Sequence, residues 1–217
     1  MARAVKLNSG SGDGTVRLDV RDGPAVRRLL EAFRPDVVHL PACMPNVDAV
    51  EDDPLAARPV NVDAVATVAR ECERIGARLV YVSTDYVFDG VAGPYAEDAE
   101  VAPVQEYGRQ KAEAEAIVRD VADAVVARTT VVYGIEAAGK NFLARLARTL
   151  RAGRELRVPA DQVGTPTSAR ALAAALVDLG ALPDPPRIVH VAGPDLLDRH
   201  AFAILAARAL GLDASLV

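Results

Sequence analysis

The 217-residue sequence has no tryptophan, and aromatic residues make up only 4% of it. Nucleic-acid sites of low sequence preference stack bases on aromatic side chains and carry positive charge, whereas this chain has a net charge of −5. No apolar run approaches the roughly 18 residues that cross a membrane, and the first residues lack the apolar core of a signal peptide. We therefore expect a soluble, cytoplasmic protein with no nucleic-acid or membrane partner.

Cysteine is also rare, with Cys43 and Cys72 as its two occurrences. The pair forms no CxxC motif and has no ligand-like spacing with the three histidines, so we expect reduced thiols and no metal site. What the sequence does hold is mostly aliphatic: hydrophobic residues make up 51% of it, enough for a sizeable core. The length suits one main core with a small additional lobe.

Short β-branched runs alternate with longer amphipathic patterns, which is typical of βαβ units with a mostly parallel sheet. Right-handed crossovers place helices on both faces of such a sheet, so we predict an α/β, Rossmann-like doubly wound fold. The predicted strands cover residues 15–20, 36–40, 78–83, 124–129 and 187–191. The predicted helices cover residues 23–33, 54–75, 107–121, 141–151, 168–179 and 199–210.

Polar loops follow three of the predicted strands, at residues 41–53, 84–106 and 130–140. Ligands of open α/β sheets bind outside the carboxyl ends of the strands, so we expect these loops to face one cleft. We divide the chain into a partial Rossmann-like cofactor domain over residues 1–135 and a small substrate-binding lobe over residues 136–217, interleaved with the last strands.

Tyr107 and Lys111 lie four residues apart near the start of a predicted helix, so they share one helix face. A nearby ammonium lowers the pKa of a phenol, which makes the tyrosine a tunable proton donor. Coincidence is the alternative explanation for such a pair. Upstream, a predicted strand ends at Ser83 and Thr84, whose hydroxyls either bind a substrate carbonyl or cap a turn.

The strings around these residues are specific. They include STDYVFDG at residues 83–90, YGRQK at residues 107–111 and DQVGTPT at residues 161–167. Further strings are LDV at 18–20, RPDVVH at 34–39, VNV at 60–62, GPYAED at 93–98, RTTVVYG at 128–134, GKNF at 139–142 and HVAG at 190–193. In this order they resemble the extended short-chain dehydrogenase/reductases, and among them the dTDP-4-dehydrorhamnose reductase-like group, over about residues 15–210.

The resemblance implies Thr84, Tyr107 and Lys111 as the catalytic set, with NADP or NAD as the cofactor. Tyr107 would protonate the developing alkoxide, Lys111 would lower the tyrosine pKa and hold the nicotinamide ribose, and Thr84 would polarise the carbonyl. The implied cofactor-binding residues are Asp19, Val20, Ala42, Cys43, Met44, Asn61, Tyr107 and Lys111. The implied substrate-binding residues are Thr84, Asp85, Tyr86, Asn141, Gln162 and Pro166. A helix cap for Asn61 and a turn for Asp19 are simpler alternatives.

The sequence also departs from the family's pattern. Its glycine cluster at residues 10–14 precedes a strand pattern rather than a helix, so we expect no glycine-rich phosphate loop and a chain that begins near the family's second strand. The sheet is then expected to lack its first strand, or to fill that place with residues 2–7, and the C-terminal end is expected to stop early. Met44 replaces a smaller or amide residue, and Glu106 would raise the pKa of Tyr107 if it lay close and buried.

Together these features predict an NAD(P)-dependent reductase that transfers hydride to the ketone of a nucleotide-linked 4-keto-6-deoxy sugar. The nucleotide sugar is the expected partner, and a homodimer is compatible with this function. Two alternatives are a non-catalytic regulatory module, as in the reductase-like regulatory subunit of methionine adenosyltransferase, and a truncated, inactive reductase. An epimerase or dehydratase is a further alternative, although Asp85 and Tyr86 do not supply the acid/base pair that dehydration needs.

Overall fold

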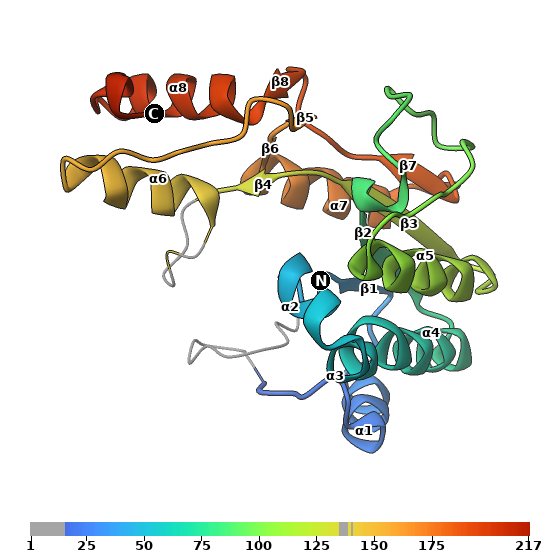
Figure 1. Cartoon of the computed structure of the whole chain (residues 1–217). Coiled ribbons are helices and arrows are strands. Elements are labelled where there is room, and N and C mark those ends of the chain that lie inside the picture. The colour runs from blue at the N-terminus through green and yellow to red at the C-terminus, as the bar shows by residue number, and fades with distance from the viewer. Residues whose placement is uncertain (1–15, 135–138, 140) are drawn as a thin grey trace. The chain divides into compact units, whose positions relative to one another are not determined.

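The computed structural model describes residues 16–134, 139 and 141–217 of the chain (Figure 1). The chain divides into two compact units, each built from two segments. Unit 1 comprises Met1–Arg128 and Leu176–His190, and unit 2 comprises Thr129–Ala175 and Val191–Val217. The two units are therefore interleaved along the sequence.

A four-stranded sheet with the order β1-β2-β3-β7 is the centre of unit 1. Its strands are β1 (Val37–Leu40), β2 (Arg78–Thr84), β3 (Ala124–Thr129) and β7 (Ile188–His190). β1 pairs with β2 and β3 pairs with β7, both in parallel. Every residue of β3 is buried, as expected for a valine-rich strand covered on both faces. The four strands and the Rossmann-like α/β class confirm the prediction from the sequence.

Unit 1 also contains helices. They are α1 (Gly23–Phe33), α2 (Val47–Asp52), α3 (Pro54–Arg58), the π-helix η1 (Pro59–Asp63), α4 (Ala64–Ile75) and α5 (Glu106–Arg119). α4 lies between α1 and α5 (Figure 1). The inward side chains of α1, α4 and α5 and those of β1 and β2 form one apolar core, which includes Leu30, Val68, Leu79 and Val118. Val50 of α2 and Ala57 of α3 pack with Tyr107 in a separate, smaller cluster.

The strand predicted at residues 15–20 is wrong for its described part. Val16 takes part in a single strand bridge, and the residues after it lead into a turn. The Asp22 amide closes this turn by donating to the Asp19 carbonyl (3.0 Å), so the chain enters α1 directly. Leu18 is nonetheless buried in the core of unit 1, which explains the apolar pattern without a strand.

Two other predictions are wrong in detail. Residues 41–53, predicted as a loop, contain the helix α2, which Asn46 caps through its side chain. The single helix predicted over residues 54–75 is divided into α3, η1 and α4, and its middle segment has π-helical hydrogen bonding. The predictions made for residues 2–7 and for the glycine cluster at residues 10–14 lie outside the described residues.

Unit 2 contains two short strand pairs. β4 (Val132–Tyr133) pairs with β6 (Thr167–Ser168) in parallel, and β5 (Val163–Gly164) pairs with β8 (Leu197–Asp198) antiparallel. Its helices are α6 (Phe142–Arg151), α8 (Arg199–Ala209) and the 3₁₀-helix η3 (Ala214–Leu216). α7 (Ala169–Ala181) begins in unit 2 and ends in unit 1.

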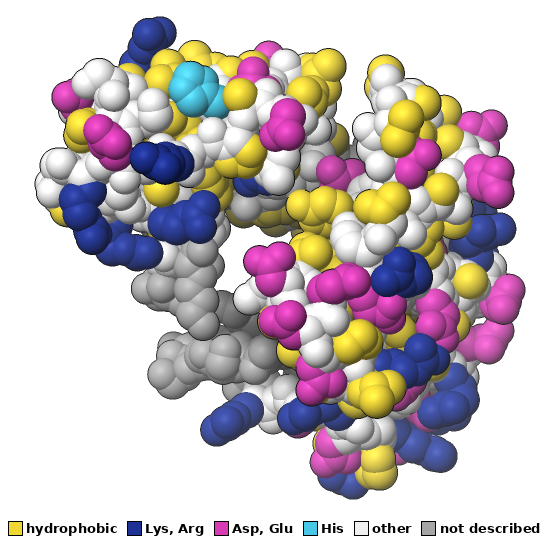
Figure 2. Space-filling view, viewed as in Figure 1, with side chains coloured by type: hydrophobic (Ala, Val, Ile, Leu, Met, Phe, Trp, Pro, Cys, Tyr) yellow, Lys and Arg dark blue, Asp and Glu magenta, His cyan; other side chains and the backbone are white. Residues whose placement is uncertain are grey.

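α6 and α8 pack together through small and aliphatic side chains, among them Leu146 and Ala203. Their outer surface is different, because α6 carries exposed arginines at positions 145, 148 and 151. Figure 2 shows basic side chains gathered over this part of the drawn face, whereas acidic and basic side chains are mixed over the helices of unit 1. The predicted helices over residues 141–151, 168–179 and 199–210 match α6, α7 and α8 within two residues at each end.

Candidate active site

The carboxyl end of β2 runs directly into the 3₁₀-helix η2 (Asp85–Val87). Thr84 caps this helix: its Oγ1 accepts a hydrogen bond from the Tyr86 amide (3.2 Å) and donates to Asp85 Oδ1 (3.1 Å). Capping was one of the two roles that the sequence left open for this hydroxyl. These two hydrogen bonds hold the Thr84 hydroxyl at the end of β2, and ligands of open α/β sheets bind at such strand ends. The neighbouring residues Asp85 and Tyr86 are exposed.

α5 begins against this turn because residue 108 has no side chain. A Cβ at Gly108 would lie 2.1 Å from the Tyr86 carbonyl oxygen and 2.5 Å from Gln105 Oε1. Gln105 Oε1 accepts a hydrogen bond from the Gly108 amide (2.6 Å) and so satisfies one free donor at the helix start. The ring of Tyr107 meets the ring of Tyr86 edge-on, with 6.1 Å between the centroids. Gly108 thus allows the first turn of α5, which carries Tyr107, to contact the end of β2.

Tyr107 is buried, and its pKa is raised above the ordinary value of a phenol. Burial is the main cause, followed by the electrostatic interaction with Cys43 and the hydrogen bond with its side chain. The net shift is therefore opposite to the lowering that the sequence predicts from Lys111, because burial outweighs it. Glu106 is not among the causes of this shift; it is half-buried, and its carboxylate accepts a hydrogen bond from Arg109 Nε (2.8 Å). The phenol stays protonated at neutral pH.

The Lys111 ammonium is held beside β2. Its Nζ donates to the Val82 carbonyl (2.7 Å) and lies 4.1 Å from the centroid of the Tyr81 ring. Lys111 is 2% exposed, and burial lowers its pKa to about 8, although electrostatic interactions with Cys43 and Glu115 act in the opposite direction. Buried groups with shifted pKa values of this kind are concentrated at functional sites.

The loop after β1, which includes residues 42–44, is fixed by buried amide side chains. The Met44 amide donates to Asn61 Oδ1 (2.8 Å), and Asn61 Nδ2 donates to Gln110 Oε1 (3.1 Å). Gln110 Nε2 in turn donates to the Pro54 carbonyl (2.9 Å). Asn61 is 1% exposed and lies within the π-helix η1, so it joins the loop to α5 instead of capping a helix.

Asp19 and Val20 lie at the turn before α1. The Asp19 carboxylate is exposed and pairs with the Arg21 guanidinium (2.6 Å), whose hydrogen bonds lower the pKa of Asp19 to about 2. These contacts are those of a turn residue, the simpler alternative for Asp19. Its described contacts join it to neither Tyr107 nor Lys111.

Two of the predicted substrate-side residues of unit 2 hold its local structure. Asn141 caps α6, because its Oδ1 accepts from the Ala144 amide (2.9 Å) and its Nδ2 donates to the Gly134 carbonyl (2.7 Å). Gln162 is exposed, and its backbone carbonyl accepts from the Arg199 amide (2.9 Å). Both contacts fix backbone within unit 2.

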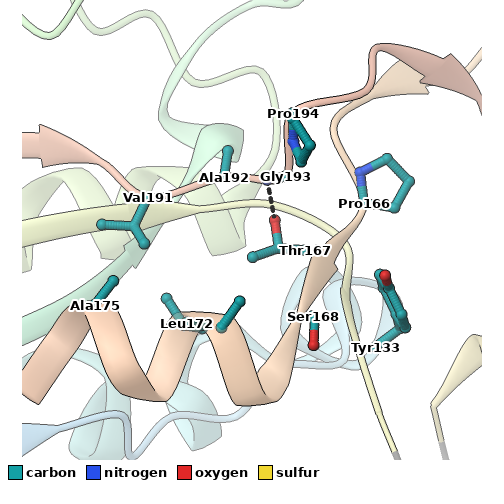
Figure 3. A pocket seen from close by; sticks show the side chains of 11 residues that line it. Tyr133, Pro166, Thr167, Ser168, Leu172, Ala175, Val191, Ala192, Gly193 and Pro194 are labelled. Atoms are coloured by element: carbon teal, nitrogen blue, oxygen red, sulfur yellow. Dashed lines mark hydrogen bonds between the residues drawn. The ribbon is translucent and has the colours of Figure 1, made fainter.

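The third such residue, Pro166, lines a cavity of about 240 Å³ inside unit 2 (Figure 3). The wall also includes β6, the first turns of α7, residues 191–194 and Tyr133 of β4, and most of its side chains are apolar. Two of the lining residues are joined, because Thr167 Oγ1 accepts a hydrogen bond from the Gly193 amide (3.1 Å). A Cβ at Gly193 would lie 2.0 Å from the Pro166 carbonyl oxygen, so a glycine is needed for this close approach.

Sequence reasoning missed a buried polar group next to Lys111. Ser83, Glu115 and Arg128 are each at most 3% exposed, and the Glu115 carboxylate binds both other side chains. Two signals could have found it. Glu115 lies one helical turn after Lys111 on the same face, and Arg128 is a charge within an otherwise apolar strand.

Metal sites and membrane spans are both missing from the described part of the chain. Within residues 16–134, 139 and 141–217, no group of three or more histidine, cysteine, aspartate and glutamate side chains could hold a metal ion. Nor is any helix in these ranges long and apolar enough to cross a membrane.

A mostly parallel sheet flanked by helices, with a Tyr-x-x-x-Lys helix that starts against the carboxyl end of a strand, defines an extended short-chain dehydrogenase/reductase. The family model described as the RmlD substrate binding domain matches residues 3–217. The chain belongs to this family.

Individual relatives agree with this assignment. A dTDP-4-dehydrorhamnose reductase of Burkholderia thailandensis is 42% identical over 148 residues, which are 67% of this chain and 49% of that protein. The spore coat polysaccharide biosynthesis protein SpsK of Bacillus subtilis is 33% identical over 202 residues, which are 92% of this chain and 70% of that protein. The chain thus spans about half of the first relative and about two thirds of the second.

A solved structure has the same fold. The crystal structure of a dTDP-4-dehydrorhamnose reductase from Bacillus anthracis in complex with NADP superposes with a TM-score of 0.87 at 27% identity. The match covers 92% of this chain and 72% of that one. The fold that the sequence predicts is thereby confirmed by an experimental structure.

Proposed function

We propose that this chain reduces the ketone of a nucleotide-linked 4-keto-6-deoxy sugar, with NADPH or NADH as the hydride donor. The observation that carries the proposal is the buried face of α5, where Tyr107 and Lys111 lie one turn apart against the strand end that bears Thr84. The names of the relatives support the substrate class, and the NADP bound to the Bacillus anthracis reductase supports the cofactor.

The donors at this end of unit 1 fit a nicotinamide cofactor. A lysine ammonium has three N–H donors, and among the described residues the Val82 carbonyl is the hydrogen-bond acceptor of Lys111. The other donors suit the neighbouring hydroxyls of a ribose. Ala42 and Cys43 lie in the loop that Asn61 fixes, and we assign this loop to the cofactor as well. When bound, the cofactor supplies the hydride.

Each of the three catalytic candidates has a chemical role that its surroundings support. Tyr107 donates its proton to the oxygen of the reduced carbonyl, and its raised pKa keeps that proton in place at neutral pH until then. The Lys111 ammonium, one helical turn away, stabilises the phenolate that remains. The Thr84 hydroxyl donates a hydrogen bond to the carbonyl in place of its present bond to Asp85.

Within unit 2, we assign Asn141, Gln162 and Pro166 to the nucleotide-sugar substrate. Within unit 1, Asp85 and Tyr86 are the residues that we expect to bind substrate beside Thr84. The support is that Pro166 lines the cavity of unit 2, and that Asp85 and Tyr86 are exposed beside Thr84.

The test is a titration of the purified 217-residue chain with NADPH and NADH, followed through nicotinamide fluorescence. The absence of tryptophan keeps the protein's own signal low. Saturable binding and turnover of a nucleotide-linked 4-keto sugar are expected. Tyr107→Phe removes the proton donor and should lower kcat by about 10²- to 10⁴-fold.

Tyr95→Phe is the matched control, because this hydroxyl binds Asp89 in the loop after η2 and has no proposed part in the chemistry. It should leave kcat near the wild-type value. A chain that binds neither nucleotide is not a self-sufficient reductase, and the binding-module alternative would then replace this proposal. If Tyr107→Phe turns over normally, the proton donor is wrongly assigned.

A further inference from the structure

Behind the Tyr107 and Lys111 face of α5 lies a buried ion pair that the chemistry above does not use. Arg128 Nη2 donates to Glu115 Oε2 (2.7 Å), and Arg128 Nε donates to Glu115 Oε1 (3.0 Å). The Ser83 hydroxyl donates to the same carboxylate, at 2.5 Å from Oε1. Both charged side chains are 3% exposed. We call Ser83, Glu115 and Arg128 the carboxylate cluster.

Stability alone is a poor explanation for such a cluster. Removing two charges from water is costly, and a well-packed apolar set of similar volume is often as stable or more stable. Buried ionic groups are instead well suited to fixing one arrangement of the elements that they join, because every partner must be in place. The role of the carboxylate cluster therefore depends on which elements it joins.

The cluster joins three elements, each near the candidate active site. Ser83 is on β2 directly before Thr84, Glu115 is on α5 one turn after Lys111, and Arg128 is on β3. The Arg128 guanidinium also lies 5.0 Å from the centroid of the Phe88 ring, and its Nη1 donates to a backbone carbonyl of the loop after η2 (3.1 Å). One carboxylate therefore ties the helix to the strand end and to the loop that follows it.

Two consecutive residues of β2 are bound by two residues of α5 that lie one turn apart. Lys111 Nζ binds the Val82 carbonyl, and the Glu115 carboxylate binds the Ser83 hydroxyl. Two bonds at consecutive positions fix both the rotation of α5 and its register along β2. The next residue of β2 is Thr84, so the same two bonds set where its hydroxyl lies relative to α5.

The cluster also acts on Lys111 through charge. The negative charge of Glu115 raises the pKa of Lys111, against the lowering that burial causes. The other groups that face the ammonium are Tyr81 from β2 and Cys43 from the loop after β1, and Arg128 faces Glu115 from β3. Loss of the Glu115 charge therefore makes the protonated form of Lys111 harder to hold.

We propose that Glu115, held in place by Arg128, is a positioning residue of the active site, which sets Thr84 through Ser83 and carries its negative charge one helical turn from Lys111. The proposal rests on the proposed reductase function. It assigns a role to residues that contact neither the substrate nor the cofactor.

Two variants test it, each in the full chain. Ser83→Ala keeps the ion pair and removes one hydrogen bond to the strand end, so kcat should fall by about three- to tenfold with little change in KM. Glu115→Gln removes the charge, so the fall of activity at alkaline pH should begin at lower pH than in the wild type. Glu113→Gln is the matched control, because Glu113 is on the same helix and pairs with Arg58 in solvent. It should change neither quantity.

A second readout needs no activity. Hydrogen exchange of a peptide covering residues 82–88 should speed up in Ser83→Ala, because the Tyr86 amide is bound to Thr84 Oγ1. Exchange in α1 should stay unchanged, which separates a local release from general loosening. If Glu115→Gln does not fold, the pair Glu115→Gln with Arg128→Met removes both charges together.

Normal exchange and a normal kcat in folded Ser83→Ala would refute the positioning role. So would a Glu115→Gln variant with the pH profile of the wild type. If the wild-type chain reduces no ketone, the proposed function fails, and the exchange experiment alone decides whether the cluster positions Thr84.

Discussion

The two faces of α5 carry the same kinds of side chain in opposite surroundings. On the inner face, Lys111 and Glu115 are each 2% exposed, whereas Arg109 and Glu113 on the outer face lie in solvent. Both glutamates have an arginine as partner. The partner of Glu115 is 3% exposed, and Arg58, the partner of Glu113, is 43% exposed.

The comparison shows that burial, and not the type of residue, decides what an ion pair does. An exposed pair exchanges its partner for water at little cost and is screened by salt. A buried pair has no such replacement, so losing one partner leaves an uncompensated charge. Burying charged side chains on the inner face of α5 costs free energy. The same burial shifts their pKa values and fixes their positions, and a catalytic site requires both effects.

The two faces should differ most in the free energy of unfolding that is lost when Glu115 or Glu113 is replaced by alanine. Glu115→Ala leaves the Arg128 guanidinium buried without a counter-charge, and we expect a loss of about 3–5 kcal/mol in the free energy of unfolding. Glu113→Ala should be hard to distinguish from the wild type. Urea denaturation of the two variants measures both values, and equal losses would remove the distinction between the faces.

The next largest effect concerns the buried cation. The native pKa of Lys111 is about 8 and the ordinary value is 10.5, so between these pH values the unfolded chain holds a proton that the folded chain has released. The cost of burying the charge is therefore fully present below pH 8 and disappears as the pH rises towards 10.5. Relative to Lys111→Met, the wild type should gain about 3 kcal/mol of stability across this window.

Arg109→Met is the outer-face control for this pH series, because arginine stays charged throughout the range. Its stability difference from the wild type should be independent of pH between 8 and 10.5. Thermal or urea unfolding at several pH values gives both curves. If the stability difference between the wild type and Lys111→Met did not change with pH, the ammonium would be better solvated than the structure shows.

A smaller effect is expected at the start of the helix. Gly108→Ala places a Cβ against the Tyr86 backbone and should cost about 1–3 kcal/mol, because backbone must move. Gly23→Ala is the matched control at the start of α1, where a Cβ would meet Thr67 at an ordinary 3.4 Å. It should be neutral or slightly stabilising, since alanine has the higher helix propensity. Similar losses at both positions would contradict the close approach of α5 to β2.

The smallest effect is that of salt on the outer face. Arg109 pairs with Glu106 at 2.8 Å and with Glu51 at 3.8 Å, both partly in solvent. Arg109→Ala should lower the melting temperature slightly at low ionic strength and not at all in high salt, because the salt screens the pairs. A loss that persists in high salt would indicate that Arg109 also packs through its carbon chain.

Much of the fold could be predicted from the sequence, because its signals are local. The valine-rich runs mark β1, β2, β3 and β7, and the apolar period marks the long helices. The strand predicted at residues 15–20 failed because Leu18 is buried through contacts with distant residues. The six-residue helix α2 was not predicted, because it is too short to show a periodic apolar pattern and is marked only by the cap at Asn46.

The site was predictable in part for the same reason. The four-residue spacing of Tyr107 and Lys111 is local and does place both on one buried face. The direction of the tyrosine pKa depends on burial and on Cys43, which is 64 residues away in the sequence, so spacing could not supply it. The pairing of Glu115 with Arg128 likewise depends on how α5 meets β3.

The π-helix η1 restricts how many residues the segment 59–63 can contain. A π-helical turn accommodates one residue more than an α-helical turn, and each residue of a helix turns the chain by about 100°. Deleting a single residue between 59 and 63 would allow one uninterrupted α-helix, yet it would rotate Asn61 away from either Met44 or Gln110. In a set of related sequences, this segment should therefore tolerate substitutions more readily than insertions or deletions.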